Sequence, residues 1–340
     1  MKSTSLSRPV ALGLIAGLLI TLLWLWVTLE GSAVSKTPHD VPVAVIGPRP
    51  AVAQLAAGLQ HNGAFRVISA PSEARAIDLV QRRKVDAIIN VDTRQVQTVQ
   101  AASTLTAAAL PQALSSGQGG VHFRASEIKP LKPGDSTGLG LMFITMACVL
   151  GGLPSGLVLA LLSKGRRPMS VADAGIWVLV TVAASAVTAL FIALIADGIL
   201  GYGGTEMLAI WAWGTMLCTA SMAFAAALVA AFGIAGFVIA AVPLLFFGVA
   251  SAPAPTPWNW DSGVFRVLGP FDPFGATTNG IRNAIFFGPA SQTRNFAVLA
   301  VWIVGSAALL AVLGWRSQQA ARATVAPAGD VEPAELERAA

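Results

Sequence analysis

The chain is divided by long apolar stretches, which are separated by polar segments of very different lengths. Six of these stretches contain no Asp, Glu, Lys, Arg or His: 9–29, 138–163, 174–196, 207–232, 234–251 and 295–315. About 20 apolar residues in a helix are needed to cross the hydrocarbon core of a bilayer, where charged side chains are costly. The pattern therefore predicts an α-helical polytopic membrane protein with six transmembrane helices.

The segment 30–137, between the first two apolar stretches, has the pattern of a soluble domain. Runs rich in β-branched residues alternate with helical stretches in the order strand 41–46, helix 50–61, strand 65–69, helix 71–83 and strand 85–91. This β-α-β-α-β order predicts a small α/β extracytoplasmic domain, inserted between helices 1 and 2, with strands that are at least partly parallel. A further helix is predicted over 95–114 and a fourth strand over 121–124.

The composition agrees with a membrane protein and sets its expected topology. Charged residues make up only 11% of the chain, whereas they are about a quarter of an ordinary soluble protein. The net charge is only +5, and no run interleaves basic and aromatic residues, which argues against nucleic-acid binding. Basic residues flank three of the predicted span ends: Lys2, Arg8, Lys164, Arg166, Arg167, Arg316 and Arg322. The positive-inside rule then places both termini in the cytoplasm and residues 30–137 outside the plasma membrane.

The two ends of the chain are expected to differ in structure. Residues 1–29 are predicted to be a cytoplasmic N-terminus followed by an uncleaved anchor helix, because the apolar run exceeds the roughly 7–15 residues of a signal-peptide core. Cleavage after Gly31-Ser32-Ala33 is the alternative. Residues 316–340, rich in Ala, Pro and Glu, are predicted to form a disordered cytoplasmic tail.

Residues 252–294 read neither as a clean span nor as a hydrophilic loop, because apolar residues alternate with single charges. We expect a helix in the outer interface or a re-entrant hairpin buried against protein. A surface loop with apolar anchors is the alternative. The charged residues and prolines of this segment are the candidates for an outer gate: Arg266, Pro270, Asp272, Pro273 and Arg282.

The second predicted span, 138–163, contains a candidate hinge. Pro154 removes a backbone donor between Gly152 and Gly156, so we expect a kink there. A moving hinge and a static kink both fit this pattern. The two glycines also have the small-x-x-x-small spacing that lets helices approach closely, either within the chain or across a dimer seam.

No pattern of catalytic, cofactor-binding or metal-binding residues is present in the sequence. The chain lacks the Gly-Lys dipeptide of a Walker-A phosphate loop and the spacing of a dinucleotide-binding loop. His39, His61 and His122 have no partner ligands at metal-binding spacing. Cys148 and Cys218 fall inside predicted spans, where a thiol behaves as a small apolar side chain. We therefore expect no enzyme, no cofactor and no metal site.

Three local features carry a resemblance to a known family: the strand Val41–Ile46 after the first span, the helix-to-strand passage Pro71–Val91, and Pro270–Arg282 ahead of the last span. With one span, a large outer α/β segment and five further spans, the chain resembles the ABC-2-type transporter permease superfamily. The closest pattern within it is that of the phage-infection-protein-like membrane proteins of the actinobacterial type. The resemblance implies a permease subunit of an exporter, which pairs with a second permease and with a separate ABC ATPase subunit.

The resemblance also implies a loop that contacts the ATPase, and Lys164, Arg166 and Arg167 are its candidates; simple positive-inside anchoring is the alternative. None of the predicted spans holds an ionisable residue, which a gradient-driven carrier normally places there, and this favours an ATPase partner. The apolar spans suit a lipid-like or amphiphilic substrate that moves outward from the surrounding membrane lipid. The alternative function is a non-transporting envelope protein, acting as a receptor, scaffold or cell-wall-interacting protein, whose outer domain binds a partner.

Overall fold

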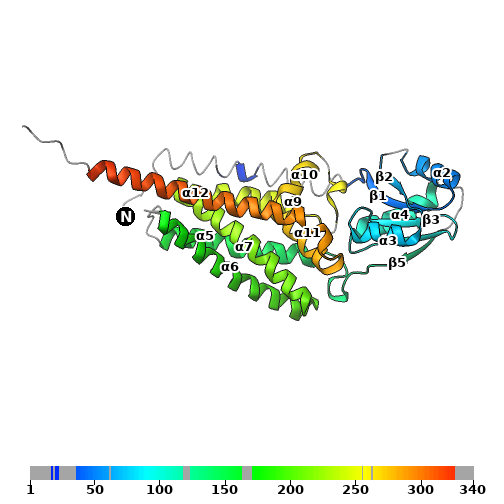
Figure 1. Cartoon of the computed structure of the whole chain (residues 1–340), viewed down its shortest axis with the longest axis horizontal. Coiled ribbons are helices and arrows are strands. Elements are labelled where there is room, and N and C mark those ends of the chain that lie inside the picture. The colour runs from blue at the N-terminus through cyan, green and yellow to red at the C-terminus, as the bar shows by residue number, and fades with distance from the viewer. Residues whose placement is uncertain are drawn as a thin grey trace, which may run out of the picture.

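The computed structural model describes residues 17, 20–22, 36–60, 63–117, 123–162, 171–254, 256–261 and 263–325. The molecule is elongated, with a helix bundle at one end and an α/β domain at the other (Figure 1). Most of the predicted first span lies outside the described residues, as do the predicted coupling residues Lys164, Arg166 and Arg167.

Four helices of the described chain are long and apolar enough to cross a membrane. They are α5 (Gly140–Leu162), α6 (Val171–Leu200), α7 (Thr205–Phe232) and α12 (Thr293–Val325). They correspond to the second, third, fourth and sixth predicted spans. The fifth predicted span is a shorter apolar helix, built from α8 (Ile234–Ala241), the π-helix η2 (Val242–Phe247) and α9 (Gly248–Ala250). Four helices can thus span a membrane, and six spans stay a prediction.

Helix α7 is the centre of the bundle, and α5, α6 and α12 pack around it. A methyl group on Gly152 of α5 would lie 2.9 Å from the carbonyl oxygen of Cys218, and one on Gly156 would overlap the carbonyl oxygen of Met222. The small-x-x-x-small spacing therefore serves close packing within the chain. Pro154 does not end α5, which continues on both sides of it, and the Pro154 side chain is exposed.

The last helix continues past the predicted end of the sixth span. Residues 316–325 are helical, so the disordered tail predicted from 316 begins too early. The sequence there is rich in Ala, Gln and Arg, which favour a helix, and adding residues to an existing helix is easier than starting a new one. Residues 326–340 lie outside the described residues.

The α/β domain is built on a five-stranded sheet with the order β2-β1-β3-β4-β5. Its strands are β1 (Val41–Ile46), β2 (Phe65–Ser69), β3 (Ala87–Asn90), β4 (Gln95–Thr98) and β5 (Arg124–Glu127). Strand β1 pairs in parallel with β2 and β3, β3 and β4 are antiparallel, and β4 and β5 are parallel. The predicted β-α-β-α-β unit is present, with α2 (Arg49–Gln60) and α3 (Glu73–Gln81) as its helices.

The helix predicted over 95–114 is wrong in its first part. The Asn90 side chain accepts hydrogen bonds from the backbone N–H groups two and three residues further on. This turn reverses the chain into β4, where Val96 is fully buried and the residues beside it are more exposed, as in a strand. Helix α4 begins only at Thr104 (Thr104–Gly117), and β5 starts at the last residue of the predicted strand 121–124.

The two faces of the sheet have separate cores. Helices α2 and α4 cover one face, where their leucines pack against the valines of β1. Helix α3 covers the other face with Ala76 and Val80. Each core also contains a buried aromatic side chain from the connecting segment 252–294, Trp260 in the first core and Phe287 in the second. The domain is therefore completed by residues that are distant in the sequence.

Candidate functional site

The connecting segment 252–294 folds into short helices between the bundle and the α/β domain. They are η3 (Trp258–Trp260), α10 (Gly263–Leu268), η4 (Gly269–Phe271), α11 (Pro273–Phe286) and η5 (Pro289–Ser291). Most of α11 is buried, and it packs against α7, α12 and α5. The Thr278 hydroxyl donates to the Thr145 hydroxyl of α5 at 3.0 Å. Helix α11 is therefore no surface loop, and burial against protein is what a re-entrant hairpin requires.

Trp260 and Phe287 anchor this segment in the two cores of the α/β domain. Trp260 is 5% exposed, and its Nε1 donates to Thr106 Oγ1 at 3.0 Å. The Phe287 ring, also 5% exposed, contacts two cations: its centroid lies 4.6 Å from the guanidinium of Arg83 and 5.3 Å from Nζ of Lys129. Burying a large apolar side chain contributes about 1.5–3 kcal/mol. Both anchors therefore hold the domain on the bundle.

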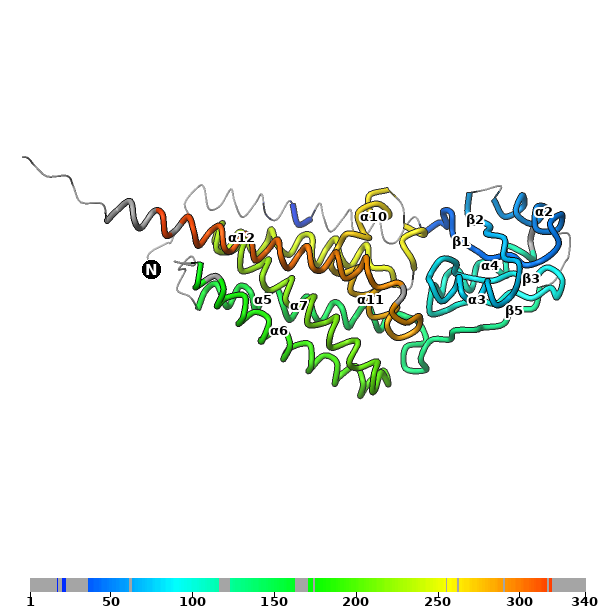
Figure 2. The backbone as a smooth tube through the Cα atoms, viewed as in Figure 1, coloured from blue at the N-terminus to red at the C-terminus, as the bar shows by residue number. Residues whose placement is uncertain are grey.

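The two crossings of the chain between the bundle and the domain are also fixed. At the entry, Lys36 Nζ pairs with Asp261 Oδ1 at 2.5 Å. At the exit, Asp135 accepts a hydrogen bond from the Tyr202 hydroxyl at 2.9 Å. The ion pair between Lys132 and Glu206 lies beside this hydrogen bond in the chain. Figure 2 shows the exit connection running from β5 to the end of the bundle where α6 and α7 meet. The domain is thus held at several separate points.

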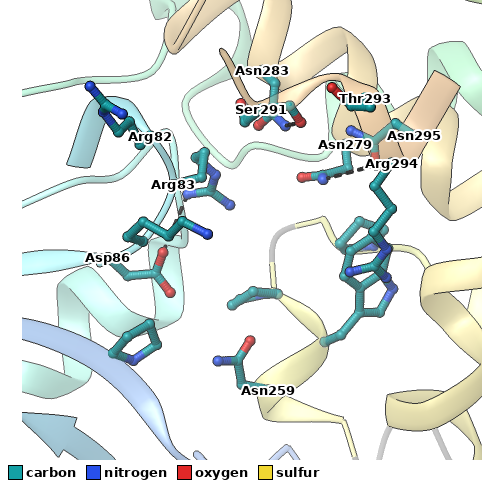
Figure 3. Close-up of a pocket in the computed structure, with 15 residues that line it drawn as sticks. Arg82, Arg83, Asp86, Asn259, Asn279, Asn283, Ser291, Thr293, Arg294 and Asn295 are labelled. Carbon is teal, nitrogen blue, oxygen red and sulfur yellow. Dashed lines mark hydrogen bonds and ion pairs between the residues drawn. The ribbon is translucent and has the colours of Figure 1, made fainter. Parts of the chain in front are cut away.

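A polar pocket of about 510 Å³ lies where the α/β domain, the connecting segment and α12 meet (Figure 3). The domain contributes the turn between α3 and β3. The connecting segment contributes η3 with the residues before it and one face of α11, and α12 contributes its first turn. The lining residues are Pro42, Arg82, Arg83, Lys84, Asp86, Pro253, Pro257, Trp258, Asn259, Asn279, Asn283, Ser291, Thr293, Arg294 and Asn295.

Cations dominate the charge of this pocket. Four lining side chains are cationic and one is acidic: Arg82, Arg83, Lys84, Arg294 and Asp86. Arg82 is paired with Asp78 of α3 at 2.8 Å. Arg294 lies over the Trp258 ring, 5.1 Å from its centroid. Within the described part of the chain, neither Lys84 nor Arg294 forms an ion pair with a carboxylate. The pocket therefore carries positive charge without a local counter-charge.

Arg83 has a backbone conformation that an arginine rarely adopts. Its φ is 57°, its N–H donates to Val80 O, and the N–H of Lys84 donates to Leu79 O, a Schellman end to α3. Glycine is usual here, because a side chain costs roughly 1–2 kcal/mol in the left-handed region. The Arg83 guanidinium pairs with Asp86 at 3.3 Å, and both side chains are largely buried. Burial raises the pKa of Asp86 and lowers the pKa of Arg83, and the charge of each opposes the shift of the other.

Buried amide groups form the remaining walls (Figure 3). Asn279 Nδ2 donates to Asn295 Oδ1 at 3.3 Å, and Asn283 Nδ2 donates to the carbonyl oxygen of Ser291 at 3.2 Å. Asn283 is 1% exposed and Asn295 is 2% exposed. Asn283 Oδ1, Asn295 Nδ2 and Ser291 Oγ have no hydrogen-bond partner among the described residues. Such atoms cost about 1–3 kcal/mol each when they stay unpaired, so their gathering beside one pocket makes it a candidate site for polar partners.

The predicted outer-gate residues do not lie together in one site. Arg282 is buried beside the pocket and donates to the carbonyl oxygen of Pro253. Asp272 instead caps α11 by accepting hydrogen bonds from the two N–H groups that follow Pro273, the first residue of that helix. Arg266 lies on α10 with its side chain exposed, and Pro270 lies in η4. Their gating role stays a prediction, as does the hinge at Pro154.

Sequence reasoning did not single out the pocket residues, although two signals were present. The run Arg82-Arg83-Lys84 lies at the end of a predicted helix, and Asn279 and Asn283 are spaced to share one helical face. Both signals are common on solvated surfaces. They gain meaning only because the fold brings them to one place.

Comparison with models of known protein families, with curated proteins and with solved structures found no match for the chain. The resemblance to ABC-2-type permeases therefore rests on the sequence features alone. Among the described residues, no cluster of three or more His, Cys, Asp or Glu side chains is placed to hold a metal ion. The chemistry available in the pocket is binding of a ligand by cations and amides.

Proposed function

We propose that this protein is the permease subunit of an exporter that moves a lipid-like or amphiphilic substrate out of the plasma membrane. A separate ATPase subunit supplies the energy, and a second permease completes the complex. The observation that carries this proposal is the position of the pocket. A polar, cationic cavity lies directly beside apolar helices, so one molecule with a polar head and an apolar tail fits both surfaces.

The distribution of charge along the bundle supports an ATPase partner. Within the described helices α5 to α9 and α12, charged residues lie only at or beyond the ends of the apolar stretches: Asp173, Asp197, Glu206, Arg294, Arg316 and Arg322. The buried Asp272 and Arg282 belong to α11, outside the predicted spans. A carrier driven by an ion gradient normally holds an ionisable residue inside a span. The sequence also lacks a phosphate loop of its own. Active transport by this chain would therefore draw its energy from another subunit.

A non-transporting envelope protein is the second candidate. The anchoring of the α/β domain by Trp260 and Phe287 favours it, because a fixed domain presents a constant surface to a partner. In this case the pocket binds a ligand and the helices only hold the domain at the membrane. If the protein is an exporter, its membrane helices are needed for function. If it is an envelope protein, one unrelated anchor helix could replace them.

A pull-down from the native membrane in mild detergent separates the two candidates. The exporter predicts a co-purifying nucleotide-binding subunit and ATP hydrolysis, whereas reproducible isolation without an ATPase would contradict it. Replacing Lys164, Arg166 and Arg167 with Gln should reduce ATPase recovery. Replacing Arg316 and Arg322 with Gln is the matched control, since those residues are also predicted to be cytoplasmic but belong to another segment.

The predicted topology is tested by a single accessible cysteine. Gln100 is exposed on the α/β domain, and both natural cysteines, Cys148 and Cys218, are buried. With those two replaced by Ala, a Gln100→Cys variant should react with a membrane-impermeant maleimide in intact cells. Labelling only after lysis would place the domain in the cytoplasm and reject the outward-facing pocket.

A further inference from the structure

We infer that the polar pocket binds a phosphate monoester, carried as the headgroup of an amphiphile. This inference deepens the proposed function by naming its substrate class and rests on that function only for the fate of the bound molecule. Binding itself follows from the chemistry of the pocket walls.

The charge of the pocket matches a group with up to two negative charges. Arg83 pairs with Asp86, and Arg82 pairs with Asp78, a carboxylate that it shares with Arg75. Lys84 and Arg294 remain, and neither has a carboxylate partner within the described residues. A phosphate monoester carries about 1.5–2 negative charges at neutral pH, whereas a phosphodiester carries one. The monoester is therefore the better match.

The hydrogen-bonding groups agree with this ligand. Asn295 Nδ2 and Ser291 Oγ are donors without a partner among the described residues. The first turn of α12 also lines the pocket, and helix N-termini favour phosphate oxygens because their N–H groups lack intrahelical partners. Asn283 Oδ1 is an acceptor without a partner. It can accept a hydrogen bond from the P–OH when the monoester binds as the monoanion, a donor that a phosphodiester lacks, whereas the dianion leaves this acceptor unpaired.

The surroundings of the pocket favour a headgroup over free phosphate. Trp258 lines the pocket, and the Arg294 guanidinium, which contacts its ring, is also 5.7 Å from the ring centroid of Phe271. Phe271 is 62% exposed, and Val267 on the neighbouring α10 is 60% exposed. An apolar surface thus begins at the cationic edge of the pocket. An acyl chain attached to the phosphate would lie on it.

The test is calorimetric titration of the purified full-length chain in detergent, without any ATPase. The probes are dihexanoyl phosphatidic acid, inorganic phosphate, dihexanoyl phosphatidylglycerol and dihexanoyl phosphatidylcholine. We expect phosphatidic acid to bind at least tenfold more tightly than each of the other three. Equal binding of phosphatidylcholine would overturn the oxyanion assignment, and equal binding of phosphatidylglycerol would overturn the monoester. Equal binding of inorganic phosphate would overturn the headgroup assignment.

Variants locate the binding to this pocket. Lys84→Gln and Arg294→Gln should each weaken phosphatidic acid binding at least tenfold without lowering the Tm of the chain by more than a few degrees. Arg124→Gln is the matched control, because Arg124 is exposed on the edge strand β5 and does not line the pocket. Unchanged affinity in both pocket variants would overturn the proposal. If phosphatidic acid binds but no ATPase co-purifies, export is rejected and the phosphate site stands. If an ATPase co-purifies but phosphatidic acid does not bind, the phosphate site is rejected and export stands.

Discussion

Replacing Trp260 with Ala should release the α/β domain from the connecting segment. The indole is 5% exposed in the core between β1, α2 and α4, and truncating a buried Trp to Ala costs roughly 3–5 kcal/mol. The change also removes the indole N–H that donates to Thr106 Oγ1, and Thr106 is fully buried. Because about 1.4 kcal/mol corresponds to a factor of ten, the opening that frees the domain should become at least 100-fold more frequent.

The loss of the indole also weakens the core that holds β1 and α4, and hydrogen–deuterium exchange of the full-length chain measures how often that core opens. Amides of β1 and α4 should exchange at least 100-fold faster in Trp260→Ala, while those of α7 stay protected. Trp260→Phe keeps a ring but loses the Nε1 donor, so it should give a smaller effect, near 1–3 kcal/mol. Trp315→Ala is the matched control, because Trp315 is 52% exposed on α12. Exchange in β1 and α4 at the rate of that control would refute the anchoring role of Trp260.

Three further predictions concern packing, a buried hydrogen bond and pH. Gly156→Ala places a methyl group against the α7 backbone and should lower stability by about 1–3 kcal/mol. Gly198→Ala has open space and should leave the Tm equal or higher; equal Tm values for the two variants would contradict the close helix contact. Tyr202→Phe leaves the buried carboxylate of Asp135 without its hydroxyl donor, which should cost about 1–3 kcal/mol, and an unchanged Tm would count against this contact. Burial raises the pKa of Asp86, so the folded chain binds that proton more tightly than the unfolded chain. The resulting stabilisation is complete below the unfolded pKa of about 3.9 and is lost as the pH rises through the folded value. The Tm difference between wild type and Asp86→Asn should therefore change as the pH rises above about 4, and a constant difference would argue against the shift.

The first two strands of the sheet could be predicted closely from the sequence. Val41–Ile46 and Phe65–Ser69 are short β-branched runs with turn residues close by, and the structure forms strands at these same residues. Strand β4 could not be found in this way. It is only four residues long and precedes an Ala-rich helix, so the helical composition of its neighbours outweighed the local alternation around Val96. What decided it was the turn at Asn90, a side-chain contact that periodicity does not report.

The pocket could not be predicted because no single segment contains it. Its walls come from Pro42 and from residues 82–86, 253–259 and 279–295. Well over a hundred positions separate the segment 82–86 from the segment 253–259. Within each stretch the pattern is ordinary, since cations after a helix and amides on a helix face usually meet water. The sequence did mark 252–294 as unusual, and Arg282 from that segment donates to Pro253, one of the residues that line the pocket. The chemistry of the site, however, depends on the docking of the domain, which a one-dimensional pattern does not contain.

The position of the pocket ties its occupancy to the docking of the α/β domain. Lys84 belongs to the domain, Asn283 to α11 and Arg294 to α12, so a ligand that contacts all three binds only when the domain is docked on these two helices. Such a ligand stabilises the docked arrangement. The stabilisation equals the difference between its binding free energies for the docked and the separated arrangements. The reverse also holds, because undocking removes a wall of the pocket and lets the ligand leave. In an exporter this would couple substrate release to domain movement, and in an envelope protein it would lock the domain when the ligand is present.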